Sequence, residues 1–213
     1  MFIIILLIWA YPSINSMIIG SVLIIIGQII HFISAGYLVK QEKLITAGPY
    51  RYVRNPFYVS SFLVDIGLCL ITRNIYVTAV YLPVFYLIVI NWRIRKEEEF
   101  LRGQFGDKYD EYCRLVPRFI PRLFPAKLPE INGYFDWQLI LKYREQWRLV
   151  RILGLIIFFY LRMSVTLVGW NKDAVIKHLS EPLNTILAIL LLAILFLPPV
   201  YEFVLRPIIR KRI

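Results

Sequence analysis

The sequence predicts an all-α integral membrane protein, a helical bundle with five full spans and one short N-terminal helix. Hydrophobic residues make up 59% of its 213 residues and charged residues only 18%, and the mean hydropathy is +0.63. A water-soluble domain with this balance could not cover its apolar surface. The apolar residues also gather in runs whose length suits a membrane helix.

The first two apolar runs differ in length. Phe2 to Tyr11 would reach about 15 Å as a helix, roughly half of the hydrocarbon core, and is predicted as the short helix. Ser16 to Leu38 is long enough to span and carries small and polar residues, which are typical of contacts between membrane helices. These residues are Gly20, Gln28, His31 and Gly36.

The next two runs are predicted as an antiparallel hairpin of spans. Phe57 to Ile71 is followed by the polar break Thr72-Arg73-Asn74, and Ile75 to Trp92 returns. Such a hairpin brings the chain back to the membrane face that it left. We therefore expect the polar stretches on either side, Lys43 to Tyr58 and Arg93 to Tyr112, to be neighbours.

The second polar stretch is predicted as a helix that leaves the membrane and is interrupted at Gly103 and Gly106. The proline-rich segment from Pro117 to Pro129 is then expected to be an extended connector, because proline disfavours helix interiors. Asp136 to Arg148 mixes aromatic and charged residues, which predicts an amphipathic helix at the membrane interface.

The last two spans are predicted at Leu149 to Trp170 and Leu183 to Leu205. Arg162 inside the first of them must face protein or reach the interface. We divide the chain into a membrane core at residues 1–125 and a C-terminal extension at 126–213, which holds the interfacial helix and these two spans.

The net charge of +11 is unevenly distributed. Most lysines and arginines lie in Lys40 to Arg54, Arg93 to Arg148 and Arg206 to Arg212, which fall on one side if the spans alternate. An excess of basic residues marks cytoplasmic loops. We therefore predict a multi-pass membrane protein whose polar stretches face the cytoplasm, with membrane lipids and not nucleic acid as partners of the positive charge.

Several signatures of soluble enzymes and metal sites are missing. The sequence has no Gly-x-Gly-x-x-Gly, P-loop, His-Glu-x-x-His or Cys-x-x-Cys motif. Its two histidines, His31 and His178, are far apart in sequence, so no metal site is predicted. His31 and Gln28 are better explained as hydrogen-bonding residues between helices. Asp65, an intramembrane carboxylate, is either functional or paired with a neighbour such as Ser60 or Ser61.

Five elements follow one another between Ser16 and Arg122. They are Leu44-Ile45-Thr46-Ala47-Gly48-Pro49-Tyr50, then Arg54-Asn55-Pro56-Phe57-Tyr58, the hydrophobic hairpin, Glu97-Glu98-Glu99 and Phe105-Gly106-Asp107-Lys108-Tyr109. Together they resemble the isoprenylcysteine carboxyl methyltransferase and phospholipid methyltransferase superfamily. The resemblance implies an integral membrane enzyme that uses S-adenosylmethionine, with a cytoplasmic helix and loop forming the cofactor pocket.

The resemblance also implies roles for individual residues. Arg93 would face the reacting group of the substrate, and Glu97 or Glu98 would hold the cofactor or orient an amine acceptor, so these three are the predicted catalytic residues. Many members have histidine where this chain has Asn55, and asparagine can hydrogen-bond but cannot carry charge. The implied cofactor-binding residues are Glu42, Lys43, Leu44, Ile45, Tyr50, Asn55, Pro56, Phe57, Tyr58 and Glu97.

The residue types suit a methyl sulfonium cofactor. Cationic groups are attracted to carboxylates and to aromatic faces. Glu97 follows Arg93 by four residues, so both lie on one face of a helix. Ring faces come from Tyr50, Phe57 and Tyr58, and hydrogen-bond donors from Arg51, Arg54 and Asn55.

The predicted function is methyl transfer from S-adenosylmethionine to a lipophilic small molecule or lipidated acceptor, either isoprenylcysteine carboxylate-like or a lipid. Two alternatives stay open: a membrane NADPH-dependent reductase of the sterol reductase type, and a non-catalytic membrane protein that retains the fold. Without the family pattern, Gly48 to Tyr58 would suit an ordinary juxtamembrane loop and Glu97 to Glu99 a solvated helix face.

Overall fold

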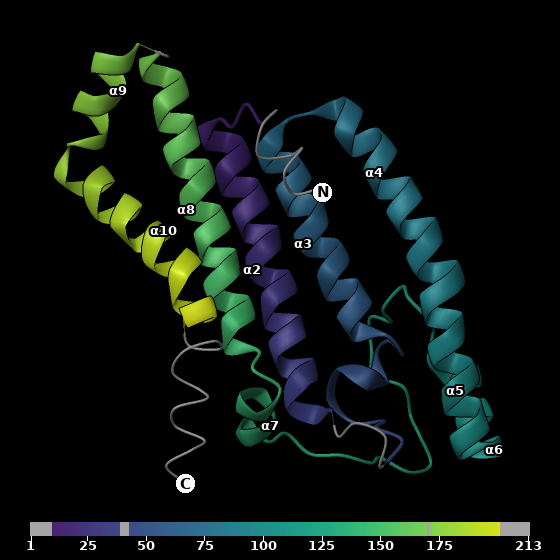
Figure 1. Cartoon of the computed structure of the whole chain (residues 1–213). Coiled ribbons are helices and arrows are strands. Elements are labelled where there is room, and N and C mark those ends of the chain that lie inside the picture. The colour runs from purple at the N-terminus through teal and green to yellow at the C-terminus, as the bar shows by residue number, and fades with distance from the viewer. Residues whose placement is uncertain (1–9, 39–42, 170, 201–213) are drawn as a thin grey trace, which may run out of the picture. The chain divides into compact units, whose positions relative to one another are not determined.

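The computed structural model describes residues 10–38, 43–169 and 171–200, and all regular secondary structure in these ranges is helical (Figure 1). The all-α prediction is confirmed for this part of the chain. Two compact units can be distinguished. The terminal unit comprises the described parts of Met1–Ile19, Leu70–Asn74 and Gln146–Ile213, and the central unit comprises those of Gly20–Cys69 and Ile75–Glu145.

The prediction of five full spans is wrong. By length and composition, two of the described helices could cross a membrane: α2, Ile14–Tyr37, and α8, Gln146–Val168. A third span results if Lys172–Leu179 and Pro182–Leu195 count as one, although a bend of 86° separates them. These segments belong to α9, Lys172–Leu179, and α10, Pro182–Val200 (Figure 1).

The predicted hairpin forms. Helix α3, Pro56–Thr72, has 17 residues and at 1.5 Å per residue reaches about 26 Å, less than the ~30 Å hydrocarbon core. Helix α4, Ile75–Ile88, has 14 residues, and its helical backbone continues without a break into the next segment. The predicted break is confirmed, since Arg73 between them has a positive φ of 55°. Beyond Ile88 the backbone changes to a π-helix, η2, Val89–Ile94.

The second polar stretch forms two helices, α5, Arg95–Phe105, and α6, Asp107–Leu115. Only one of the two predicted interruptions is present. Gly106 separates the helices with a φ of 55°, which glycine adopts easily, whereas Gly103 lies inside α5. The break at Gly103 was predicted wrongly because a single glycine weakens an exposed helix without ending it.

The segment after α6 has no helix or strand from Val116 to Asp136, as expected of the proline-rich connector. Helix α7, Trp137–Lys142, follows, with the Asp136 side chain accepting a hydrogen bond from the Gln138 backbone N–H at 2.8 Å. Arg144, at a φ of 60°, separates α7 from α8. The amphipathic helix expected from Asp136 to Arg148 is therefore much shorter in the structure.

Two short parts of the prediction lie outside the described residues: most of the N-terminal run Phe2 to Tyr11, and the end of the last predicted span after residue 200. Within the terminal unit, α8 packs against α10. At Gly154 a Cβ atom would lie 2.7 Å from Cγ2 of Ile194, so the small residue lets the two helices approach closely.

Helices α2 and α3 are in similarly close contact within the central unit. A Cβ atom at Gly27 would lie 2.7 Å from the Ser60 carbonyl oxygen, and one at Gly67 would lie 2.6 Å from the Gly20 carbonyl oxygen. Gln28 and His31, on the predicted contact face of α2, are buried. The expected helix-contacting face of this span is therefore confirmed.

We expect Gly27→Leu to destabilise the protein by about 2 kcal/mol, because the added side chain would force the two backbones apart. Thermal unfolding in mild detergent measures the effect. The matched control is Gly103→Leu, since a Cβ atom at Gly103 has no atom within 4 Å. Equal melting temperatures for the two variants would contradict the close contact of α2 and α3.

Candidate functional site

The two polar stretches meet in the central unit. The hydroxyl of Tyr58, in the first turn of α3, donates a hydrogen bond to Oε1 of Glu97 in α5 at 2.8 Å. Arg54 Nη2 lies 3.1 Å from Oε1 of Glu98. The spatial prediction from the hairpin is therefore confirmed.

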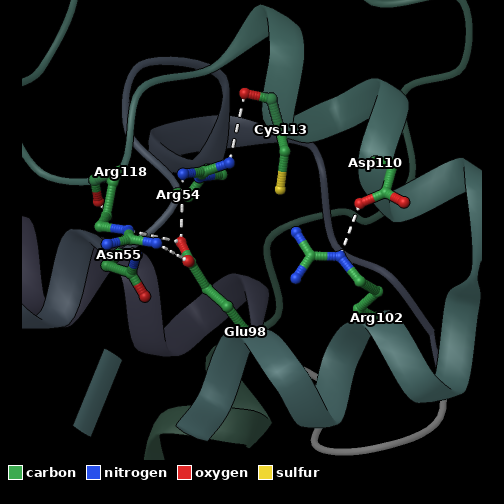
Figure 2. Close-up of polar contacts among 7 residues, drawn as sticks. All are labelled: Arg54, Asn55, Glu98, Arg102, Asp110, Cys113 and Arg118. Atoms are coloured by element: carbon green, nitrogen blue, oxygen red, sulfur yellow. Dashed lines mark hydrogen bonds and ion pairs between the residues drawn. The ribbon is translucent and has the colours of Figure 1, made fainter. Parts of the chain in front are cut away.

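Glu98 is buried at the centre of this contact, with 4% of its surface exposed. Figure 2 shows its carboxylate between the guanidinium groups of Arg54 and Arg118. Arg118 Nε donates to Oε1 at 3.1 Å, and Arg118 Nη2 pairs with Oε2. Both carboxylate oxygens are thus engaged by arginine, which is the arrangement a buried charge needs. We call these three residues the Glu98 clamp.

The proline-rich connector lies along the first polar stretch and supports it. Its backbone accepts hydrogen bonds from the Arg54 N–H at Pro117 O, 2.9 Å, and from Asn55 Nδ2 at Arg118 O, 3.0 Å. Figure 2 shows Asn55 beside Arg118. The amide nitrogen of Asn55 therefore holds the connector, a contact that the sequence did not reveal.

Glu97 and Arg93 share one side of this region with Tyr58. Both are exposed, and Arg93 lies in the π-helix η2. Burial and then Glu97 raise the pKa of the Tyr58 hydroxyl above its ordinary value, while the nearby charge of Arg93 opposes this. Tyr58, Arg93 and Glu97 thus form a cluster of one hydroxyl and two opposite charges. Single π-helical turns are frequent at functional sites.

A cavity of about 120 Å³ is lined by residues of both polar stretches. Two of them, Tyr50 and Arg54, each have a buried polar atom, Oη and Nε, with no hydrogen-bond partner among the described residues. Buried polar atoms nearly always have a partner, so these two point to a ligand or water that would accept from them. The other lining residues are Leu38, Lys43, Leu44, Ile45, Phe100, Leu101, Phe105, Tyr109 and Tyr112.

The backbone of Tyr50 is held in place by a hydrogen bond. It lies in the 3₁₀ helix η1, Gly48–Arg51, and its carbonyl oxygen accepts a hydrogen bond from the Tyr112 hydroxyl at 2.7 Å. Burial, with a further contribution from Glu97, raises the pKa of the Tyr50 hydroxyl far above its ordinary value. The hydroxyl therefore keeps its proton and remains a donor toward the cavity.

The structure brings some predicted site residues to this region and leaves others apart. Lys43, Leu44, Ile45 and Tyr50 line the cavity, whereas Glu42 lies outside the described residues. Pro56 begins α3 and lines a different groove. The ring of Phe57 contacts His31 edge-on, at 4.8 Å between centroids.

His31 and Asp65 have structural partners. His31 Nδ1 lies 3.1 Å from Ser60 Oγ and Nε2 lies 2.8 Å from Glu145 Oε2, so His31 links α2 to α3, as predicted. The Tyr81 hydroxyl donates to Asp65 Oδ2 at 3.3 Å. Among the described residues, no group of three or more His, Cys, Asp or Glu side chains is placed to hold a metal ion.

Part of the chain is similar in sequence to a known protein family. Residues 13–108 match the family of phospholipid methyltransferases. This stretch contains α2, the hairpin and the first contacts between the two polar stretches. The resemblance expected from the sequence is confirmed over it.

The individual relatives are named either as a metal resistance protein or as protein-S-isoprenylcysteine O-methyltransferases. The chain is 39% identical over 84 residues to the cobalt-zinc-cadmium resistance protein CzcN of Cupriavidus metallidurans, covering 39% of this chain and 38% of that protein. It is 35% identical over 102 residues to a protein-S-isoprenylcysteine O-methyltransferase of Schizosaccharomyces pombe, covering 48% and 43%.

A probable protein-S-isoprenylcysteine O-methyltransferase of Oryza sativa subsp. indica is 32% identical over 115 residues, with 48% of this chain and 60% of that protein covered. The chain thus spans between about two fifths and three fifths of the length of these relatives. No solved structure matches it.

Proposed function

We propose that the chain is a multi-pass membrane methyltransferase that uses S-adenosylmethionine and methylates a lipophilic acceptor. The observation that carries the proposal is a cavity lined by both polar stretches, where two lining residues have donors, Tyr50 Oη and Arg54 Nε, without a partner among the described residues. Both residues lie within the region that matches the phospholipid methyltransferase family.

The residues present fit the charges of this cofactor. Tyr50 and Arg54 offer donors to a carboxylate or to ribose oxygens, and the exposed Glu97 carboxylate attracts a sulfonium or ammonium group. The ring of Tyr58 adds an aromatic face for a cation. The cavity is smaller than the ~300–1,000 Å³ of most ligand pockets, so it would enclose one end of the molecule while Glu97 and Tyr58 hold the rest.

The chemistry of the bound cofactor is an electrophilic methyl group on a cationic sulfur. The protein has to align the acceptor with that group and exclude water, and it needs no covalent intermediate. Arg93 is the exposed cation of the cluster, so it is placed to pair with an acceptor carboxylate. With an amine acceptor, Glu97 would orient the amine and receive its proton.

The roles of two adjacent glutamates can now be separated. Glu97 is exposed and touches Tyr58, whereas Glu98 is buried between two arginines. We therefore assign Glu97 to the cofactor and Glu98 to holding the loop in place. The relatives named protein-S-isoprenylcysteine O-methyltransferase favour a prenylated cysteine carboxylate as acceptor. We place the site on the cytoplasmic side, where S-adenosylmethionine is made.

Calorimetric titration of the purified chain in detergent tests the proposal. We expect binding of S-adenosylmethionine and none of NADPH. Binding of NADPH alone would favour the reductase alternative, and binding of neither would favour a non-catalytic protein. Both outcomes would overturn the proposed function.

We expect Tyr50→Phe to weaken S-adenosylmethionine binding about tenfold, because it removes one donor from the cavity at a cost of about 1.4 kcal/mol. The matched control is Tyr134→Phe, since Tyr134 is 77% exposed. Equal affinities of the two variants would show that the Tyr50 hydroxyl does not touch the cofactor.

A further inference from the structure

A second hollow in the central unit is separate from the cofactor cavity. Neighbouring residues of η1 line the two: Tyr50 lines the cavity, and Arg51 lines the second hollow, which we call the Arg51 groove. Its volume is about 540 Å³, within the ~300–1,000 Å³ typical of ligand sites. It therefore has room for a ligand of its own.

Most of the described residues that line the Arg51 groove are apolar. Ile30 and Ile33 come from α2, Val59 comes from α3, and Pro121 and Pro125 come from the connector. Ile33 is 40% exposed, so the groove continues onto the outer face of α2. Because α2 is long and apolar enough to span a membrane, this face is where hydrocarbon chains would lie.

The groove also carries positive charge. Among the described residues that line it, Arg51 is the only charged one. Its Nε and Nη2 donate to the Ala126 carbonyl oxygen at 3.2 Å and 3.1 Å, which fixes the guanidinium. Its Nη1 has no hydrogen-bond partner within the described residues. From Arg114 at the end of α6 to Lys127 in the connector, the chain carries four basic residues and no acidic one.

The connector also exposes large apolar side chains beside these charges. Ile120 is 79% exposed, Leu123 is 91% exposed and Phe124 is 78% exposed. Phe119 anchors the segment by ring contacts to Phe62 and Tyr86. Exposed apolar residues alternating with cations are typical of a surface that enters the headgroup region of a bilayer. Arg51, whose carbonyl oxygen accepts a hydrogen bond from the Ala126 N–H of this connector, would then lie near the lipid headgroups.

We infer that the Arg51 groove binds one anionic phospholipid of the surrounding bilayer. Its acyl chain would lie along Ile30 and Ile33, and its phosphate would meet Arg51, with Arg122 and Lys127 adding positive potential. Basic pockets beside membrane helices recognise anionic headgroups in this way. A free phosphate would leave the apolar lining unfilled. The site is independent of methyl transfer.

Native mass spectrometry tests this inference with the full chain reconstituted in phosphatidylcholine nanodiscs that contain phosphatidylglycerol. We expect one phosphatidylglycerol to be retained on release into mild detergent. Arg51→Gln should lower this retention about tenfold, and Ile33→Trp should lower it similarly by filling the groove. Arg114→Gln, which removes the same charge from an exposed position outside the groove, should behave as the wild type.

Two results would overturn the inference. One is equal retention of phosphatidylcholine and phosphatidylglycerol by the wild type, which would mean unspecific lipid adhesion. The other is wild-type retention by the Ile33→Trp variant, which leaves the Arg51 guanidinium and its contact with Ala126 intact. Neither measurement involves S-adenosylmethionine. A negative result for lipid binding would therefore not affect the proposed function, and a failure of the proposed function would not affect the lipid site.

Discussion

Replacement of Arg93 by alanine is expected to lower methyl transfer by about two to three orders of magnitude while leaving cofactor affinity nearly unchanged. Arg93 is exposed in the π-helical segment beside Tyr58 and Glu97, so its charge is available to an acceptor. A carboxylate loses negative charge as it is methylated, so Arg93 would act by holding the acceptor in line with the methyl group, and loss of such positioning can cost about 100-fold or more. Transfer of a labelled methyl group to N-acetyl-S-farnesylcysteine measures the rate, and calorimetry measures the affinity.

The matched control is Arg95→Ala, which removes an exposed arginine two residues further on and should keep its activity. Glu97→Gln and Tyr58→Phe should show the opposite pattern, with weaker cofactor binding. If Arg93→Ala instead lost affinity and Glu97→Gln lost only turnover, the roles of the two charges would be exchanged. Methylation of phosphatidylethanolamine but not of the prenylated cysteine would identify an amine acceptor.

The meeting of the two polar stretches could be predicted from sequence because it follows from chain geometry alone. Any hairpin that breaks at Thr72-Arg73-Asn74 returns Arg93 to the side of Asn55, whether or not its helices are full spans. The number of spans could not be predicted in this way. It depends on where each helix begins, ends and bends, and composition does not show the 86° bend between α9 and α10.

The contacts of the connector could not be predicted from the sequence. Arg118 meets Glu98 from 20 residues away, and Asn55 bonds to the backbone of Arg118 across 63 residues. Proline density predicted an extended segment but not which surface it would cover. The sequence likewise could not show which of Glu97 and Glu98 would hold the cofactor. Neighbouring residues on a helix point about 100° apart, and only the packed structure shows which of them faces inward.

Glu98→Ala is expected to be among the most destabilising single substitutions in the central unit. It would leave the guanidinium groups of Arg54 and Arg118 facing each other without a counter-charge, and breaking a buried ion pair typically costs about 3–5 kcal/mol. Because the Arg118 side chain is 37% exposed, we expect about 3 kcal/mol, or a melting temperature lower by roughly 10 °C. Thermal unfolding in detergent measures this.

Glu99→Ala is the matched control, since Glu99 is exposed and adjacent. The double variant Glu98→Gln with Arg118→Gln separates the clamp from other effects, because neutralising both partners leaves only Arg54 charged and should cost less than the sum of the single changes. If Glu98→Ala instead kept its melting temperature but lost S-adenosylmethionine binding, Glu98 would belong to the cofactor site. A stable protein with intact binding would show that Glu98 is needed for neither role.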